Sequence, residues 1–370
     1  MPALNDFSST SNTKKKRKRN FWYILVKVAL IFMGATILLN LLIFGIAYLN
    51  HRSKLTDEEQ YLIEPGQLVE VNGHYMHVYI TGNEDAETTL VFMHNNKDSD
   101  ACISLRPLFA YLEEDYRIVY VDRSGNGYSE VSGESRDIDT MLEETRTAVA
   151  EAGVTGSFVL VPNGTAGNEA VYWAEKYPDE VDAIIGINMA YPEQSAGETL
   201  DAGYDRYGKT LMFFSKIGGH RFLSNTYPEN DLGLYTEREM IVRDALISRY
   251  YYTEDMYNEE LNYYTNAEYV AEYADFPDDI PMLMIWANPL LEPYFSYDED
   301  MRSQYEDILE DYSDEMDLSG EYNKENFAYF EDYDNVTCVE LSGPVALFEF
   351  DPEGVAEYML DYLDDMQLDE

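Results

Sequence analysis

The sequence predicts an α/β fold with a mostly parallel sheet, preceded by a single N-terminal transmembrane helix. Two observations carry this prediction. An apolar stretch at residues 21–49 follows a run of basic residues, and from about residue 66 short apolar runs alternate with amphipathic segments. Strands that are apolar on both faces and separated by helices are typical of a parallel sheet that helices cover on both sides.

The apolar stretch has the length and composition of a membrane span. Val28 to Leu49 alone supply 22 residues, interrupted by Asn40, and a bilayer core requires about 20. Phe21, Trp22 and Tyr23 read as an interfacial aromatic belt. The segment is too long for the apolar region of a signal peptide, and no clear small-x-small cleavage site follows it, which predicts an uncleaved signal anchor.

The basic run "KKKRKR" at 14–19 sets the expected orientation. Because positive residues stay on the cytoplasmic side, residues 1–20 form a cytoplasmic tail, 21–49 the span and 50–65 a polar stalk. Residues 66–370 then form a domain outside the cell membrane. The membrane, contacted through residues 21–49, is therefore the first predicted partner of this single-pass protein.

Charge narrows the classes of ligand. The chain has 71 acidic and 25 basic residues, and from residue 55 onward 70 acidic residues face only 16 basic ones. A net charge of −54 on that part argues against nucleic acid and anionic lipid as ligands. The acidic runs "SYDEDM", "EDILEDYSDEMD" and "LDYLDDMQLDE" lack the spacing of a calcium loop and read as solvated faces, with a cationic partner left open. Two cysteines, Cys102 and Cys338, allow at most one disulfide.

The elements of the sheet follow in order. "QLVEVNG" and "HYMHVYITG" are two β-rich runs joined by Asn72-Gly73, which predicts an antiparallel hairpin. Strands are expected at "TLVFMH", "YRIVYVD", "SFVLVP" and "AIIGIN", with helices at about 105–113, 138–152 and 166–177 between them. From about 191 to 279 tyrosine-rich helical sequence predicts a cap insertion. The sheet resumes at "IPMLMIWAN" and "VTCVELSG", and a last helix follows Asp351-Pro352.

Four motifs in this order resemble the α/β-hydrolase family across roughly residues 66 to 366. "VFMHNN" resembles the strand and His-Gly of the oxyanion loop, with Asn95 in place of the glycine. "VDRSGNGYS" resembles the D-x-x-G-x-G-x-S turn. "VPNGTAG" resembles the strand-to-helix nucleophile elbow, and "GPVALFEFDPEG" the loop that carries the catalytic histidine. The resemblance implies an α/β-hydrolase fold with a helical cap.

The resemblance places all three positions of the catalytic triad on residues that lack the required chemistry. Acyl transfer by this family needs a nucleophile, an imidazole base and an orienting carboxylate. Matching without gaps puts Gly164 at the nucleophile, Leu290 at the acid and Val345 at the histidine. A shift of one residue would promote Thr165 to nucleophile, but it would break the gapless match of the following helix to the family.

Two function classes compete on this basis. The first is a non-catalytic pseudo-hydrolase whose cleft, lined by His94, Asn95, Asn163 and Thr165, binds a small acyl or peptide-like ligand or a protein partner. The second is an active hydrolase of ester or peptide-like bonds that uses Thr165 with His94 or Glu292. A third, weaker class is an acidic surface component. No metal spacing and no cofactor motif occur, so we expect neither a metal nor a cofactor.

Overall fold

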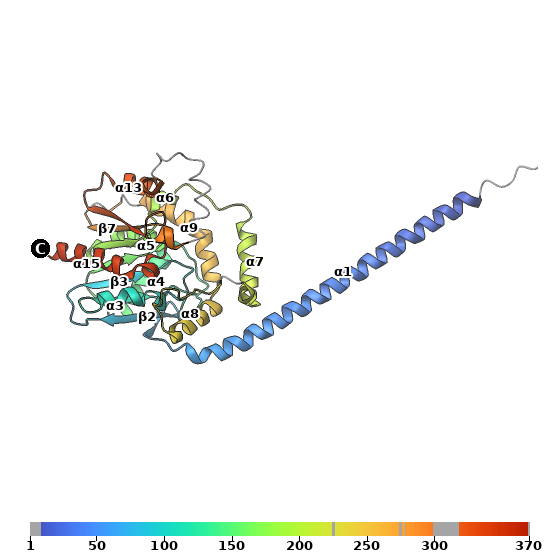
Figure 1. The fold of residues 1–370 in the computed structure, drawn as a ribbon, viewed down its shortest axis with the longest axis horizontal. Helices are drawn as coiled ribbons and strands as arrows, with labels where there is room; N and C mark the ends of the chain where they lie inside the picture. Colours follow the sequence, from blue (N-terminus) through green and yellow to red (C-terminus); the bar gives the residue numbers. More distant parts are fainter. Residues whose placement is uncertain (1–8, 224–225, 274–275, 278, 299–317, 369–370) are drawn as a thin grey trace, which may run out of the picture.

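The computed structural model describes residues 9–223, 226–273, 276–277, 279–298 and 318–368. An α/β domain with helices on both faces of one sheet carries a long helix, α1 (Ser9–Glu58), that projects away from it (Figure 1). The predicted acidic run at 306–317 lies outside the described residues, as do residues 1–8 of the tail.

The sheet has eight strands, and most of them are parallel as predicted. The strands are β1 (Gln67–Val71), β2 (His74–Gly82), β3 (Thr89–Met93), β4 (Arg117–Val121), β5 (Phe158–Pro162), β6 (Val181–Ile187), β7 (Met282–Asn288) and β8 (Val336–Ser342). Their order is β1-β2-β4-β3-β5-β6-β7-β8. Only β2 runs antiparallel to its neighbours, β1 and β4, and every pair from β4 to β8 is parallel.

The predicted hairpin is confirmed, and its turn explains the Asn-Gly pair. Val71 pairs with His74, which leaves two residues in the turn. Both have positive φ, +51° for Asn72 and +89° for Gly73. A type I′ turn needs this conformation at both central positions, and asparagine and glycine adopt it most readily.

Alternation along the strands builds two hydrophobic cores. In β3, Val91 and Met93 face the side covered by α4 (Ile138–Glu151) and α5 (Ala166–Lys176). Leu90 and Phe92 face the side covered by α3 (Arg106–Leu112) and α15 (Pro352–Leu368). Both faces are buried, which is why the strands read as continuous apolar runs and not as an apolar-polar alternation.

One helix differs from its predicted bounds. The segment expected as a single helix over about 105–113 begins earlier, as α2 (Ala101–Ser104), and restarts as α3. Pro107 lies in the first turn of α3. A proline has no backbone N–H and is tolerated in a first turn but not in a helix interior, so the chain divides into two short helices at this point.

The remaining helices lie around the carboxyl ends of the strands or connect elements. Between β6 and β7 come α6 (Pro192–Ser195), α7 (Tyr204–Lys216), η3 (Gly219–Phe222), α8 (Glu237–Arg249) and α9 (Glu254–Tyr273). The others are η1 (Glu59–Tyr61), η2 (Pro178–Glu180), α10 (Tyr294–Tyr297), α12 (Leu318–Glu321), α13 (Lys324–Phe330) and α14 (Leu347–Phe350).

A buried ion-pair network fixes the segment between β6 and β7 to the sheet domain. The guanidinium of Arg243 on α8 is almost completely buried, and its Nε lies 2.6 Å from Oδ2 of Asp100. Its Nη2 lies 2.7 Å from Oε2 of Glu349 on α14. The two carboxylates hold the pKa of Arg243 above its usual range, although burial alone would lower it.

Helix α1 continues through the predicted stalk to Glu58. Between Phe21 and Tyr61 it contains an exposed segment long and apolar enough to cross a membrane, a property that signal sequences share. Both thiols, Cys102 and Cys338, are free.

Candidate functional site

The carboxyl end of β5 forms the sharp turn that leads into α5. Gly164 has a φ of +56°, whereas Thr165 has an ordinary helical φ of −64°. The carbonyl of Gly164 accepts hydrogen bonds from the backbone N–H groups of Gly167 and Ala190, at 3.1 and 2.8 Å. The left-handed conformation therefore falls on the glycine, where no Cβ opposes it.

The side chain of Asn95 lies directly over Gly164. A Cβ atom added to Gly164 would lie 3.1 Å from Cβ of Asn95 and 3.4 Å from its Nδ2. Asn95 is held in place, because its Nδ2 donates to Oδ2 of Asp98 and its Oδ1 accepts from the backbone N–H of Lys97. A side chain at position 164 would therefore contact Asn95, from the loop after β3.

Leu290 and Val345 lie beyond the carboxyl ends of the neighbouring strands β7 and β8. The backbone N–H of Leu290 donates to Oδ1 of Asn288, and the carbonyl of Val345 accepts from Nδ2 of Asn188 at 2.7 Å. The side chain of Val345 is 66% exposed. Glu292 is also exposed, and neither of these loops presents an imidazole.

The five histidines of the chain lie elsewhere. His51 on α1 and His220 in η3 pack against each other with ring centroids 5.3 Å apart. In the hairpin, Nε2 of His74 lies 2.9 Å from Oγ of Ser124, and Nδ1 of His77 lies 2.8 Å from Oδ2 of Asp122. Nδ1 of His94 lies 2.9 Å from Oδ2 of Asp98, and its ring packs edge-on against Phe348.

A cavity of about 390 Å³ lies over the turn after β5. The loop after β3, the turn itself and the segment between β6 and β7 each contribute to its wall. The lining residues are Asn95, Asn96, Lys97, Gly164, Thr165, Leu200, Tyr204, Glu259, Glu260, Tyr263 and Tyr264. Of the predicted ligand-binding residues, Asn95 and Thr165 line this cavity, whereas His94 and Asn163 are not among its described lining residues.

Thr165 and Asn163 have different surroundings. Nδ2 of Asn163 donates to the carbonyl of Ile187 at 2.8 Å, so this side chain ties β5 to β6. Oγ1 of Thr165 is buried and has no hydrogen-bond partner among the described residues. Buried hydroxyl groups are usually hydrogen-bonded, so this one is a polar group beside the cavity whose partner the described residues do not supply.

Glu259, which lines the cavity, belongs to a buried ion-pair network that no motif of the sequence indicates. Arg123 places its Nη2 2.8 Å from Oε2 of Glu169 on α5 and its Nη1 3.3 Å from Oε1 of Glu259 on α9. Burial raises the pKa of Glu259, and Arg123 opposes that rise. These residues are far apart in the sequence and each reads alone as a surface charge, so no local pattern marks them.

The upper wall joins two more charges to tyrosines. Glu260 contacts Nζ of Lys97 and accepts hydrogen bonds from the hydroxyl groups of Tyr204 and Tyr252. The hydroxyl of Tyr263 lies 3.1 Å from Oγ of Ser195. The pocket therefore combines tyrosine rings with charged side chains that pair with one another or with nearby groups.

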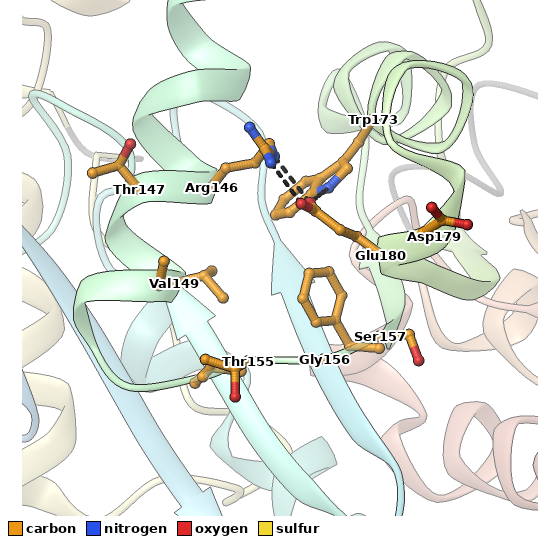
Figure 2. A pocket seen from close by; sticks show the side chains of 12 residues that line it. Arg146, Thr147, Val149, Thr155, Gly156, Ser157, Trp173, Asp179 and Glu180 are labelled. Carbon is orange, nitrogen blue, oxygen red and sulfur yellow. Dashed lines mark hydrogen bonds and ion pairs between the residues drawn. The ribbon is translucent and has the colours of Figure 1, made fainter.

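A larger cavity, of about 530 Å³, lies at the opposite ends of the strands (Figure 2). It opens where β5 and β6 begin, between α4 and α5. Arg146 and Glu180 face each other across it in a two-point ion pair, and Nε1 of Trp173 donates to Glu180 at 2.8 Å. These charged groups satisfy one another, and ligands of open α/β sheets bind at the carboxyl ends of the strands. The cavity above Gly164 is therefore the better candidate.

Sequence comparison gives one similar protein of nearly equal length. The chain is 27% identical to the uncharacterized protein YbdG of Bacillus subtilis over 349 residues, which cover 93% of this chain and 98% of that protein. A shorter match, 33% identical over 82 residues, joins 22% of this chain to 29% of a bifunctional esterase/perhydrolase of Acinetobacter calcoaceticus. No family model matches the sequence.

Solved structures match over most of the chain. An epoxide hydrolase of Vigna radiata superposes with a TM-score of 0.57 at 17% identity, covering 81% of this chain and 98% of that one. DbjA superposes with a TM-score of 0.53 at 15% identity, covering 82% and 99%. Similarity at this level identifies the fold and carries no statement about activity.

Proposed function

This chain has an α/β-hydrolase fold, and from that premise we propose that it is a membrane-anchored binding protein without hydrolase activity. In this proposal residues 21–49 anchor it in the cell membrane with the tail inside and the domain outside. The cavity above Gly164 then binds a small acyl or peptide-like ligand, or a short segment of a protein partner, as a pseudo-hydrolase.

The observation that carries the proposal is the pairing of Gly164 with Asn95. By the resemblance to α/β-hydrolases, position 164 corresponds to the nucleophile and position 95 to the glycine of the oxyanion loop. In this chain position 164 is glycine and position 95 is asparagine. A Cβ added at position 164 would lie 3.1 Å from Cβ of Asn95. The elbow keeps its φ of +56° without a group that can attack an acyl carbon.

The other two triad positions support the same conclusion. Val345 directs an aliphatic side chain to solvent, and Leu290 follows β7 where the carboxylate is expected. Losing nucleophile, base and orienter together removes the groups that act as a unit, which costs several orders of magnitude in rate.

One observation favours the alternative, an active hydrolase that uses Thr165. Thr165 lines the cavity, and its buried Oγ1 has no hydrogen-bond partner among the described residues. However, the same observation means that no described side chain is placed to take its proton, and the ring of His94 is held by Asp98 and Phe348. A hydroxyl without a base is a weak nucleophile.

Hydrolysis and binding assays on the full chain in lipid nanodiscs separate the two functions. We expect no turnover of short-chain p-nitrophenyl esters or aminoacyl p-nitroanilides, while one or more of these compounds raises the Tm. Thr165→Val removes one hydroxyl contact of about 1 kcal/mol, so the Kd of such a compound rises about fivefold.

The matched control is Thr337→Val, on the exposed side of β8. This change leaves the Kd unaltered. Turnover by the wild type that Thr165→Val abolishes would establish the hydrolase and refute the binding protein.

A further inference from the structure

The segment Tyr204–Leu223, formed by α7 and η3, has a surface unlike the rest of the domain. It contains Arg206, Lys209, Lys216 and Arg221, a quarter of the 16 basic residues after position 55, but only one of the 70 acidic ones, Asp205. Its exposed apolar side chains are Tyr207, Phe213, Phe222 and Leu223. Arg221 is buried against α1, whereas Arg206, Lys209 and Lys216 are exposed. We call these three exposed basic side chains, together with the exposed apolar ones, the α7 surface.

The α7 surface is fixed against helix α1. The rings of Phe213 and Phe44 pack edge to face with centroids 5.9 Å apart. Figure 1 shows α7 on the side of the domain that faces the projecting part of α1.

The next contacts along α1 involve η3. Arg221 donates two hydrogen bonds to the carboxylate of Glu58, both 2.7 Å long, and a third to Nδ1 of His51 at 2.9 Å. Gly218 allows the close approach, since a Cβ there would lie 2.4 Å from Cβ of His51. The junction between α1 and η3 is therefore held by side-chain contacts and is not a free hinge.

The contact with Phe44 sets the depth of α7. Phe44 lies five residues before Leu49, the last residue of the apolar stretch. At a rise of 1.5 Å per residue, Phe44 lies about 8 Å inside the outer end of that stretch. Phe213, which packs against Phe44, consequently reaches the outer part of the acyl chains when residues 21–49 span a bilayer. Interfacial helices bury their apolar face to a similar depth, about 5–10 Å.

We propose that the α7 surface docks onto the acidic lipid headgroups of the membrane that α1 crosses, so that α7 lies in the interface as an in-plane helix. This inference rests on the membrane anchor of the proposed function. Helices with Lys or Arg beside exposed aromatic side chains bind such interfaces through apolar burial and attraction to acidic lipids.

The local charge therefore reverses the conclusion drawn from the whole domain. A net charge of −54 beyond residue 55 repels an acidic lipid surface. The α7 surface is locally basic, so it is repelled less than the rest of the domain. The contacts of Phe213 and Arg221 with α1 place it next to the bilayer. Tyr204, which begins α7, also lines the cavity above Gly164, so the lipid contact and a cavity wall share one helix.

Quenching by brominated lipid tests the proposal on the full chain in nanodiscs of phosphatidylcholine with phosphatidylglycerol, one chain per disc. Native Trp22 reports the anchor. In a Trp22→Phe background, Phe213→Trp reports α7 and Tyr111→Trp, on α3, is the control for an exposed aromatic side chain remote from α7. The emission of the buried Trp173 and Trp286, measured in Trp22→Phe alone, is subtracted from every sample. We expect emission from Trp22 and from Phe213→Trp to fall at least twofold, and that from Tyr111→Trp to stay unchanged.

The outcomes separate the two proposals. Unquenched Trp22 overturns the anchor and with it the docking of α7. If Trp22 is quenched but brominated lipid reduces the emission of Phe213→Trp no more than that of Tyr111→Trp, only the docking is overturned. Quenching of Phe213→Trp that requires two chains per disc means that a second copy, not lipid, covers the α7 surface.

Charge reversal tests the preference for acidic lipid. Lys209 is 59% exposed and pairs with Asp205 on its own helix, and Lys324 is 63% exposed and pairs with Glu321 in the same way. Lys209→Glu combined with Lys216→Glu reduces the quenching of Phe213→Trp at least twofold in acidic discs, whereas Lys324→Glu leaves it unchanged. Equal quenching in acidic and in pure phosphatidylcholine discs overturns the role of acidic headgroups.

Discussion

At the scale of single residues, Asn95 and Gly164 act as a pair. A side chain at position 164 meets two costs at once: a φ of +56°, which favours glycine, and a contact of 3.1 Å with Cβ of Asn95. Either cost alone is tolerable in an enzyme that uses the strain. Together they make glycine the residue that fits this turn.

This pairing predicts a non-additive stability effect. Gly164→Ser lowers the free energy of unfolding by about 1–3 kcal/mol through backbone strain and contact with Asn95. Adding Asn95→Gly recovers part of the loss, because it removes the side chain above the turn. Urea denaturation of the two single variants and the double variant measures the coupling.

The matched control is Gly133→Ser, because Gly133 also has a positive φ, +68°, but no neighbour within 4 Å of an added Cβ. There, Asn95→Gly has no rescuing effect. If the loss of unfolding free energy in the double variant equals the sum of the losses in the two single variants, the steric pairing is contradicted. Neither variant gains esterase activity, since no imidazole lies at the turn.

The sequence locates some site residues and misses others for a physical reason. Gly164, Asn95 and Thr165 belong to contiguous motifs, so their place beside one cavity follows from strand order. Arg123, Glu169 and Glu259 come from three separate segments and meet only when the domain is packed. Charged residues on amphipathic helices are normally solvated, and a sequence does not reveal which of them turn inward.

At the scale of elements, α8 connects three parts of the molecule. Arg243 ties it to Asp100 and Glu349, and the next residue, Asp244, lies near Glu58 of α1 and Arg221 of η3. Burial raises the pKa of Asp244 from 3.8 to about 6, with Asp100 and Glu58 adding to the rise and the two arginines opposing it. Its Oδ1 has no hydrogen-bond partner among the described residues.

This shift predicts a pH-dependent gain from Asp244→Asn. The folded chain binds the Asp244 proton more tightly than the unfolded chain, so stability falls as the pH rises from about 4 through about 6. Removing the charge therefore raises the Tm at pH 7.5 by about 2 °C, for about 1 kcal/mol after allowance for solvent screening. At pH 4 wild type and variant melt together.

Differential scanning calorimetry in zwitterionic nanodiscs measures both conditions. Asp361→Asn, at an exposed position of α15, serves as the control and gives the same small difference at both pH values. A Tm for Asp244→Asn below that of the wild type at pH 7.5 would mean that the ionised carboxylate stabilises the junction with α1.

The elements themselves are largely predictable, because each obeys a local rule. Runs that are apolar on both faces predict the parallel strands, and Asn72-Gly73 predicts the hairpin. The division at Leu105 and the extension of α1 to Glu58 were not predicted. The first depends on one proline in a helical segment, and the second on Arg221 and His220, which hold α1 from a segment more than 160 residues later.

At the scale of the whole molecule, long-range repulsion opposes the folded state. The net charge is −46, and after residue 55 it reaches −54. The buried pairs of Arg123 and Arg243 are screened less by salt than the exposed carboxylates are. Added salt therefore weakens the repulsion more than it weakens these pairs.

We expect the Tm of the full chain in zwitterionic nanodiscs to rise by a few degrees as NaCl increases from 10 mM to 1 M. Over that range the screening length falls from about 30 Å to about 3 Å. Choline chloride at equal ionic strength produces the same rise, which distinguishes screening from binding of Na⁺. A Tm that falls with salt would show that ion pairs outweigh repulsion.

The side chain above Gly164 also constrains the mutational paths open to this protein. A serine introduced at position 164 arrives beneath Asn95, so it carries a folding penalty. Glycine at position 95 would have to come first to relieve that contact. Under the proposed function neither change alone confers hydrolase activity, so a serine at this turn has no path of single beneficial steps.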